Sequence, residues 1–412
     1  MAPAGARGVL GLADDLSGAA ETASVLMSRT TRTELVLAPA AGPLPADADV
    51  LVVDLDDREL PPTEAVARAV AALRAWPSGA RSPRVLAKFD SLLRGGVAAR
   101  VGVLHARGGA VVAPALPALR RLVRDGVLTV DGAPLSGTAA WATQGVAAPE
   151  SVAAALAPLP TVLLDLPTVR STTLPDAVAR AVRDGRVPVC DGESEGDLDA
   201  VVSAVMALSD ELPDLALAGS AGLAAALGRT WSAAPAPPPP PHLGPPGPLV
   251  VVGTAEPVAA QQVARLIEAG VAEVRLPAAT LLDGEWADGW PDRLAAAVGA
   301  GPVVVRLDPD SPVAPSDSRK VSAELGEMVG RTLAHTGPVD LVLTGGETAR
   351  RVLDALGVTR LTPLGQIHHG AVMCRLPDGA AVVTRPGSFG GPDSLLAILA
   401  GLRTSTAPPS RP

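Results

Sequence analysis

Short apolar runs alternate with longer helical segments along most of the chain. Before residue 234 these runs are VLGLA, ELVLA, DVLVVDL, RVLAKF, GAVVAPA, TVLLDL, VPVC and LALAGS. After residue 248 the alternation starts again with LVVVG, AEVRL, GPVVVRL, DLVLTGG, VMCRL and AAVVTR. Continuous apolar runs of this length, separated by helices, are typical of parallel sheets that are buried on both faces. The pattern predicts two α/β domains with largely parallel sheets.

A proline-rich segment separates the two series of strands. Residues 234–248 read APAPPPPPHLGPPGP, which cannot sustain a helix or a central strand because proline lacks the amide donor. At 412 residues the chain is also longer than a single hydrophobic core usually supports, which favours two domains. We therefore expect an N-terminal domain over 1–233, a linker over 234–248 and a C-terminal domain over 249–405. The active site is expected in the cleft between the domains. Within the first domain, RDGVLTVDGAPL predicts a small hairpin.

Composition narrows the classes of partner. Hydrophobic residues make up 48% of the chain but aromatic residues only 2%, so the cores must consist mainly of Ala, Val and Leu. The formal net charge of -9 argues against nucleic acid as a partner. No apolar stretch is long enough to span a membrane, and the N-terminus lacks a secretory signal. We expect a cytoplasmic protein without membrane partners, and we allow for a homo-oligomer.

Two adjacent carboxylates, Asp14 and Asp15, follow the first predicted strand. Acidic residues at this position commonly only cap the next helix. In an open parallel sheet, however, ligands bind outside the carboxyl ends of the strands. Neighbouring residues face opposite ways, so we expect only one of the two side chains to point into a site.

A second strand end in the first domain carries both basic and acidic side chains. RVLAKFDSLLRGG places Lys88, Asp90, Ser91 and Arg94 around one strand-to-helix turn. The turn could be a solvated loop in which Asp90 or Ser91 caps the helix. A lysine beside an arginine fork also suits a small carboxylate or a phosphoryl group, and Lys88 is one of only two lysines.

Three glycine-containing junctions mark the second domain. Glycine lets the backbone approach a ligand, and the free amides of a helix N-terminus favour phosphate. Three such loops in one domain favour a nucleotide over simple tight turns. No GxxxxGK[ST] or helix-opening GxGxxG is present, which argues against a P-loop protein and a dinucleotide dehydrogenase. The candidate nucleotide-binding residues are Thr254, Gly345, Gly346, Glu347, Thr348, Gly387 and Gly390.

Together these segments resemble the four-carbon acid sugar kinases over nearly the whole chain. The similar segments are ADDLSGA, VVDLDDREL, KFDSLLRG, APALP followed by VDG, GSAGLAAAL, TGGETA and RPGSFGGPD. The resemblance implies an N-terminal domain that binds the acid sugar and a C-terminal domain that binds ATP. It further implies phosphorylation of the terminal hydroxyl of an erythronate, threonate or 3-oxo-tetronate. Phosphoryl transfer from ATP leads us to expect a bound Mg²⁺ ion, without a dedicated protein metal site.

The resemblance also assigns roles to residues of the first domain. It implies that Asp14 or Asp15 orients or deprotonates the attacking hydroxyl, and we favour Asp15. We expect Arg94 to clamp the substrate carboxylate. The remaining substrate-binding candidates are Asp54, Arg58, Lys88, Asp90 and Ser91. In the second domain the chain departs from the family, because GTAEP replaces a serine-rich loop and TRPGSFG replaces TKSGGFG.

Two alternatives remain open from the sequence. DVLVVDLDDREL mimics a DxD phosphatase, in which Asp54 would be the nucleophile and Asp56 the acid or base. The chain could instead be an acid-sugar sensor with a degenerate nucleotide site. His368 and His369 are adjacent, and on a strand they would point to opposite faces, so we expect no metal there.

Overall fold

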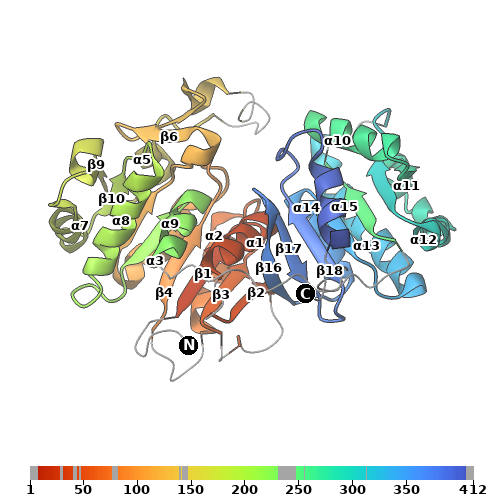
Figure 1. The fold of residues 1–412 in the computed structure, drawn as a ribbon. Helices are drawn as coiled ribbons and strands as arrows, with labels where there is room; N and C mark the ends of the chain where they lie inside the picture. The colour runs from red at the N-terminus through yellow and green to blue at the C-terminus, as the bar shows by residue number, and fades with distance from the viewer. Residues whose placement is uncertain are drawn as a thin grey trace, which may run out of the picture. The chain divides into compact units, whose positions relative to one another are not determined.

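The contacts within the chain divide it into two compact units, Met1–Pro235 and Ala236–Pro412. The computed structural model describes residues 8–27, 31–39, 44–45, 48–76, 82–138, 141, 147–230, 247–254, 256–311 and 313–404. Figure 1 shows both units as sheets covered by helices. Most of the predicted proline-rich linker lies outside the described residues.

Unit 1 is built on an eight-stranded parallel sheet with the order β2-β3-β1-β4-β11-β5-β10-β9. The central strands are buried on both faces, which explains their uninterrupted apolar sequences. All eight coincide with predicted strands. Their bounds are β1 Val9–Ala13, β2 Thr33–Leu37, β3 Val50–Asp54, β4 Arg84–Lys88, β5 Ala110–Ala113, β9 Thr161–Leu164, β10 Val187–Cys190 and β11 Ala216–Gly219.

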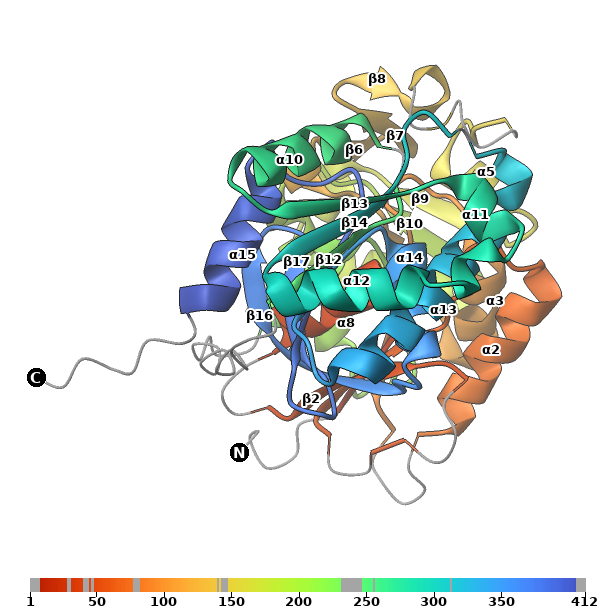
Figure 2. The ribbon, with the colours of Figure 1, turned by 90° about the vertical axis from the view of Figure 1, so that its right-hand side faces the viewer.

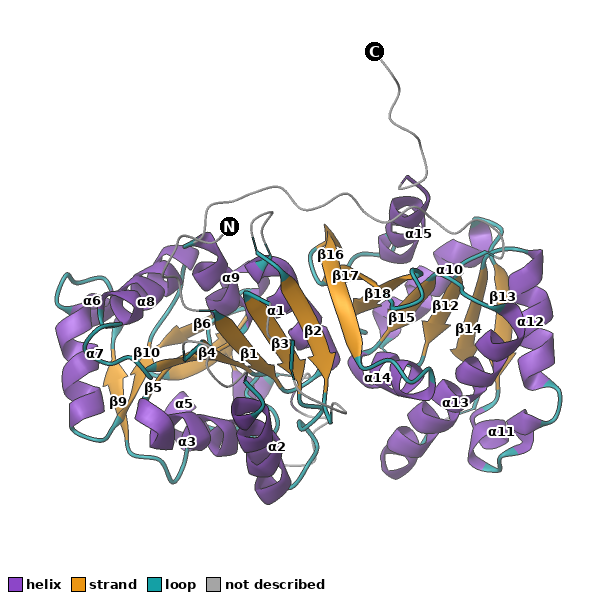
Figure 3. Cartoon of the chain, turned by 90° about the horizontal axis from the view of Figure 1, so that it is seen from below, coloured by secondary structure: helices purple, strands orange, loops and turns teal. Residues whose placement is uncertain are grey.

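Helices cover both faces of this sheet (Figure 3). On one face α1 (Leu16–Leu26) packs against α9 (Ala221–Arg229), which also contacts α8 (Glu195–Ala207). On the other face α2 (Pro62–Arg74) contacts α3 (Val97–Gly108). The remaining helices are α5 Val152–Ala155, α6 Leu166–Val169 and α7 Leu174–Arg183, with short 3-10 turns at η1 Pro117–Leu119 and η2 Leu135–Gly137.

The predicted hairpin is confirmed as a small antiparallel sheet of three strands. It consists of β6 (Arg121–Arg124), β7 (Val127–Val130) and β8 (Ala133–Pro134). Backbone hydrogen bonds between Leu116 and Arg121 start the hairpin, and bonds between Val123 and Gly192 tie it to the loop after β10. The first residue of β6 is therefore held close to the end of β5.

Unit 2 has a mixed sheet with the order β13-β14-β12-β15-β18-β17-β16. The first five strands are parallel, whereas β17 is antiparallel to both β18 and β16. The tight turns before and after β17 are too short for the crossover that parallel pairing needs. The bounds are β12 Leu249–Val252, β13 Ala272–Leu276, β14 Val303–Leu307, β15 Leu341–Thr344, β16 Arg360–His368, β17 Ala371–Arg375 and β18 Ala381–Arg385.

The helices of unit 2 form two layers. In the first, α13 (Ser318–Thr336) contacts both α12 (Trp290–Ala300) and α14 (Gly346–Ala355) (Figure 2). In the second, α10 (Pro257–Glu268) packs against α15 (Ser394–Thr404). The shorter elements are α11 Ala278–Leu282, η3 Glu285–Ala287 and η4 Pro315–Asp317.

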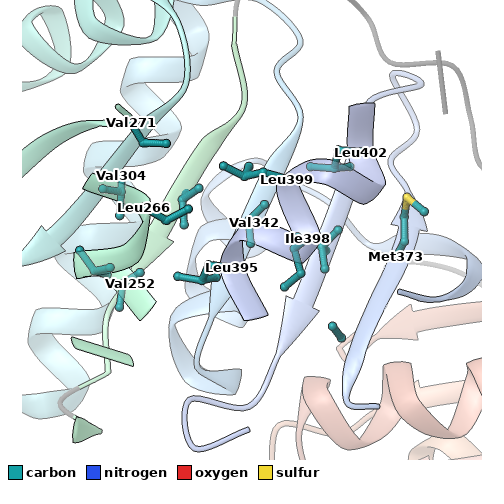
Figure 4. Close-up of a cluster of buried hydrophobic side chains, with 14 of the residues drawn as sticks. Val252, Leu266, Val271, Val304, Val342, Met373, Leu395, Ile398, Leu399 and Leu402 are labelled. Carbon is teal, nitrogen blue, oxygen red and sulfur yellow. The ribbon is translucent and has the colours of Figure 1, made fainter. Parts of the chain in front are cut away.

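The layer of α10 and α15 covers the core of unit 2 (Figure 4). Leu266 of α10 and Leu395 and Ile398 of α15 meet Val304 and Val342 of the sheet, and all five are fully buried. The cluster contains no aromatic residue, as the composition predicts. None of the described helices is long and apolar enough to cross a membrane.

Candidate functional site

The predicted sugar-site residues meet at one edge of the sheet of unit 1. Asp54 ends β3 and Lys88 ends β4, and both pair in register with Ala13 at the end of β1. Asp14 and Asp15 follow directly. The other predicted residues lie in the loops after β3 and β4: Arg58, Asp90, Ser91 and Arg94. The fold thus collects all eight residues at the carboxyl ends of three neighbouring strands.

Arg58 joins the two carboxylates that follow β1. Its Nε and Nη2 donate to the two oxygens of Asp14, each at 2.9 Å, and its Nη1 lies 2.9 Å from Asp15 Oδ2. The backbone at Arg58 is pressed against Gly95, whose φ is +77°. A Cβ at Gly95 would come within 2.8 Å of the Arg58 carbonyl oxygen. The glycine therefore permits the close approach of the two loops that carry the site.

Asp14 is fully buried, and both of its oxygens are occupied. The backbone N–H of Asp90 donates to Oδ2 at 3.2 Å, and Arg100 Nη2 lies 3.6 Å from the same oxygen. Burial alone would raise the carboxyl pKa, but the surrounding Arg and Lys charges outweigh burial and hold the pKa of Asp14 well below its usual range. Asp14 is therefore ionised at neutral pH and anchors Arg58.

Asp15 has a different environment from that of its neighbour. Its Oδ1 accepts the N–H of Gly18 at 2.8 Å and so caps the N-terminus of α1. Its side chain remains 23% exposed, with Oδ2 beside Arg58. Of the two adjacent carboxylates, Asp15 is therefore the one that a ligand can reach.

Lys88 places a buried ammonium beside the first turn of α1. The residue is only 6% exposed. A Cβ at Gly18 would lie 2.6 Å from Lys88 Nζ, so the absence of a side chain at this position makes room for the ammonium. Within the described part of the chain, Nζ has no carboxylate at ion-pair distance.

Asp90 and Arg94 form a closed pair across the turn that follows β4. Arg94 Nε and Nη2 donate to the two oxygens of Asp90, at 2.5 and 3.1 Å. Burial opposes ionisation of Asp90, but the charge of Arg58 and the hydrogen bonds of Arg94 lower its pKa. The neighbouring Ser91 hydroxyl accepts a short hydrogen bond from Arg121 of β6.

Asp54 is less accessible than the phosphatase alternative requires. It is fully buried, and Oδ1 accepts the backbone N–H of Asp56 at 3.0 Å. A nucleophile must reach the phosphorus of its substrate. The geometry therefore disfavours Asp54 as a nucleophile and indicates that it shapes the loop after β3.

Three residues at this edge were missed by the sequence analysis: Asp57, Arg100 and Arg121. Arg100 donates to Asp57 Oδ1 at 2.5 Å in a fully buried pair. Burial raises the pKa of Asp57 to about 6, although Arg100 acts in the opposite direction. The position of Arg100 on the same helical face as Val97 and Leu104 could have revealed a buried charge. The sequence offers no comparable signal for Asp57.

The three predicted nucleotide loops of unit 2 also come together. They follow β12, β15 and β18, which are adjacent parallel strands. Gly253 lies against Thr348, where a Cβ would collide with the threonine hydroxyl. Gly387 lies against Thr254, whose Oγ1 would be 2.5 Å from such a Cβ. Gly345 caps α14, and Gly346 and Glu347 open its first turn.

The loop after β18 is held by two buried side chains. Gln262 Nε2 lies 3.0 to 3.2 Å from the carbonyl oxygens of Phe389, Gly390 and Gly391. Arg385 donates to Gln262 Oε1 and to the Phe389 carbonyl, and burial lowers its pKa to about 10. Because carbonyl and amide of one peptide point in opposite directions, the amides of Gly390 and Gly391 face away from Gln262.

The adjacent histidines contact this loop individually. His368 Nε2 lies 2.9 Å from Ser394 Oγ, and the His369 ring stacks on Phe389 with centroids 5.7 Å apart. Within the described ranges, no group of three His, Cys, Asp or Glu side chains is arranged to hold a metal ion. His369 thus packs on the loop after β18, and His368 contacts the first residue of α15.

Comparison with known proteins assigns a different kind of ligand to each unit. A model of a sugar-binding N-terminal domain matches residues 9–227, and a model of a nucleotide-binding C-terminal domain matches residues 249–395. The chain is 34% identical to the D-threonate kinase of Cupriavidus necator over 420 residues, which cover 96% of this chain and 98% of that protein. It is 30% identical to the 3-oxo-tetronate kinase of Methylobacterium radiotolerans, with 93% and 96% covered.

The fold is shared with a solved structure as well. A crystal structure from Salmonella typhimurium, described as a putative tRNA synthase, has a TM-score of 0.80. It is 23% identical, and the match covers 95% of this chain and 98% of that chain. The two domain models and the full-length relatives establish that the chain belongs to the four-carbon acid sugar kinase family.

Proposed function

We propose that the chain transfers the γ-phosphoryl group of ATP to the terminal hydroxyl of a four-carbon acid of the threonate or 3-oxo-tetronate type. The similarity to D-threonate kinase over 96% of the chain carries this proposal. Unit 1 supplies a buried cluster of charges at one sheet edge, and unit 2 supplies three glycine-lined strand-to-helix turns. A polar acid and a nucleotide require these two kinds of site.

In this proposal Asp15 acts on the attacking hydroxyl. Its carboxylate is partly exposed, and two fixed donors, the Gly18 amide and Arg58, set its orientation. Asp14 does not touch the substrate but holds the Arg58 fork. The hydroxyl oxygen attacks the γ-phosphorus, the bond from that phosphorus to the bridging oxygen breaks, and ADP leaves with the electron pair. Asp15 takes the hydroxyl proton.

The nucleotide phosphates are proposed to lie on the loops of unit 2. The N-terminus of α14 follows Gly345, and the helix dipole favours negative charge at its first turn. The amides of Gly390 and Gly391, turned away from Gln262, add further donors. The Thr254 and Thr348 hydroxyls line the same three loops. Arg385 is not placed to bind phosphate directly, because it is fully buried and its two terminal nitrogens are directed at Gln262 and at the Phe389 carbonyl.

Magnesium fits this set of donors. Mg²⁺ in phosphoryl-transfer sites is usually held by one or two carboxylates together with phosphate oxygens and waters. Glu347 provides a partly exposed carboxylate in the first turn of α14, where Arg319 Nε lies 3.9 Å from its Oε1. When bound, the ion would neutralise charge on the phosphates, and Glu347 would be its protein ligand.

An ADP-release assay tests the proposal. The purified chain is incubated with ATP, Mg²⁺ and, in separate reactions, D-threonate, D-erythronate or a 3-oxo-tetronate. We expect acid-dependent ADP release with at least one of these acids. No turnover with any acid, combined with saturable binding of an acid and no binding of ATP, would establish the sensor alternative instead.

A further inference from the structure

The arginines at the edge of unit 1 differ in whether a carboxylate already occupies them. Those that are paired are Arg58 with Asp14 and Asp15, Arg94 with Asp90, and Arg100 with Asp57. Arg121 and Lys88 have no carboxylate at ion-pair distance among the residues that the structure describes. Lys88 is buried and Arg121 is half-buried, and a cation withdrawn from water without a counter-ion is costly unless a ligand supplies one.

Arg121 is brought to the site by the hairpin. It is the first residue of β6, and its backbone N–H and carbonyl both bond to Leu116. Its Nη1 donates to Ser91 Oγ, and Ser91 directly follows Asp90, whose backbone N–H donates to Asp14. Of the five N–H donors of a guanidinium, this hydrogen bond uses one.

The surroundings of Arg121 lower its pKa and so make its charged form less favourable than in water. Burial lowers the pKa of the guanidinium, and Arg94 lowers it further. Attraction by Asp90, Glu21 and Asp131 acts in the opposite direction without forming a close pair with it. A carboxylate arriving at this position would therefore stabilise the charged form.

We propose that Arg121, together with Lys88, binds the carboxylate of the acid sugar. This inference rests on the proposed function and moves the clamp from Arg94, which the sequence suggested, to a residue of the hairpin. Arg94 already directs Nε and Nη2 at Asp90, and this is the pair of donors that would grip a second carboxylate. Arg121 offers a fork and Lys88 a point charge, both at the edge where Ser91 lies.

The test compares an acid with its neutral analogue. D-threitol has a hydroxymethyl group where D-threonate has the carboxylate. In Arg121→Gln we expect kcat/KM for D-threonate to fall roughly 10- to 100-fold, the range for a lost hydrogen bond to a charged group. The kcat/KM for D-threitol, or its inhibition constant if it is not turned over, should change less than about threefold.

Arg124→Gln is the matched control, because Arg124 lies on the same strand but is exposed and pairs with Glu193. It should leave the ratio of acid to neutral substrate unchanged. If Arg121→Gln leaves the ratio of kcat/KM for D-threonate to that for D-threitol unchanged, the inference is overturned. The proposed function still stands in that case, because it depends only on turnover by the parent. If the parent phosphorylates no acid, the proposed function itself fails. Should Arg121→Gln not fold, Arg121→Lys decides, since loss of the fork must still lower the ratio and an unchanged ratio overturns the inference.

Discussion

At the residue scale, a single guanidinium organises the edge of unit 1. Arg58 spends two donors on Asp14 and one on Asp15, so the buried carboxylate fixes the arginine and the arginine orients the exposed carboxylate. Adjacent carboxylates in one chain thereby acquire different tasks. The difference follows from burial, because Asp14 has no contact with solvent and Asp15 is partly exposed.

Asparagine substitutions should separate these tasks. In Asp15→Asn we expect turnover to fall roughly 10² to 10⁴-fold with little change in melting temperature, because asparagine still caps a helix. Asp14→Asn should instead destabilise the fold by about 3 to 5 kcal/mol, since it leaves Arg58 without its buried partner. ADP-release kinetics and urea unfolding of both variants measure the two effects. The assignment is reversed if Asp14→Asn loses turnover at unchanged stability while Asp15→Asn keeps full activity.

Asp57 should give the stability of unit 1 an unusual dependence on pH. In the folded chain its pKa is about 6, whereas the unfolded residue has the ordinary value of 3.8. Between these values the folded state retains a proton that the unfolded state releases. The contribution of Asp57 is therefore greatest below about pH 4 and is lost progressively as the pH rises to about 6.

Thermal unfolding between pH 4 and pH 7 tests this contribution. We expect the difference in melting temperature between the parent and Asp57→Asn to shift in favour of the variant as the pH rises. The pKa of Asp14 is lowered in the folded chain, so the contribution of Asp14 to stability changes only below about pH 4. Asp14 therefore does not alter the trend between pH 4 and pH 7. A difference that stays constant from pH 4 to pH 7 contradicts the raised pKa.

Several of these residues could be identified from the sequence, whereas others could not. Asp14 and Asp15 directly follow an apolar strand and Lys88 ends one, and parallel strands bring such positions together. Arg121 lies on a hairpin strand, and only the tertiary bonds of that hairpin carry it to Ser91. The sequence placed Arg94 near the site but could not reveal that Asp90 already occupies its fork.

At the element scale, glycines set how closely the strand-to-helix turns of unit 2 approach each other. Gly253 after β12 lies against Thr348 of α14, and Gly387 after β18 lies against Thr254. Three adjacent parallel strands can therefore end in one compact set of loops. The sequence predicted these loops because glycine followed an apolar run in each case.

Gly253→Ala should damage this arrangement selectively. Its Cβ would collide with the Thr348 side chain and push the start of α14 away. We expect ATP to lose most of its ability to raise the melting temperature, while an acid sugar stabilises the variant as it does the parent. Gly299→Ala in α12 is the control, because nothing lies within 4 Å of its Cβ position. Equal stabilisation of Gly253→Ala and parent by ATP would remove these turns from the nucleotide site.

One strand escaped prediction, and its sequence explains why. Residues Arg360–His368 form β16, yet Pro363 and Gly365 interrupt the apolar pattern. The pairing of β16 with β17 shifts register between Pro363 and Gly365 and again between Gln366 and His368. Proline and glycine inside a strand usually mark an edge or a bulge, and neither gives the periodic signal of a regular strand.

At the scale of the whole molecule, sugar binding and nucleotide binding belong to two different units of the chain. Each unit has its own core and helices on both faces of its sheet, and each carries its candidate residues at the carboxyl ends of neighbouring parallel strands. Few aromatic residues are needed to build such a core, because Val, Leu and Ala fill the core of unit 2.

The chemical identity of the product tests this account most directly. The chain is incubated with ATP, Mg²⁺ and the acid that gives the fastest ADP release, and the mixture is followed by ³¹P NMR without proton decoupling. We predict a phosphate monoester that appears in step with ADP, as a triplet because its phosphorus couples to the two protons of the terminal CH2. Inorganic phosphate in place of the ester, or a doublet from a secondary ester, would contradict the account.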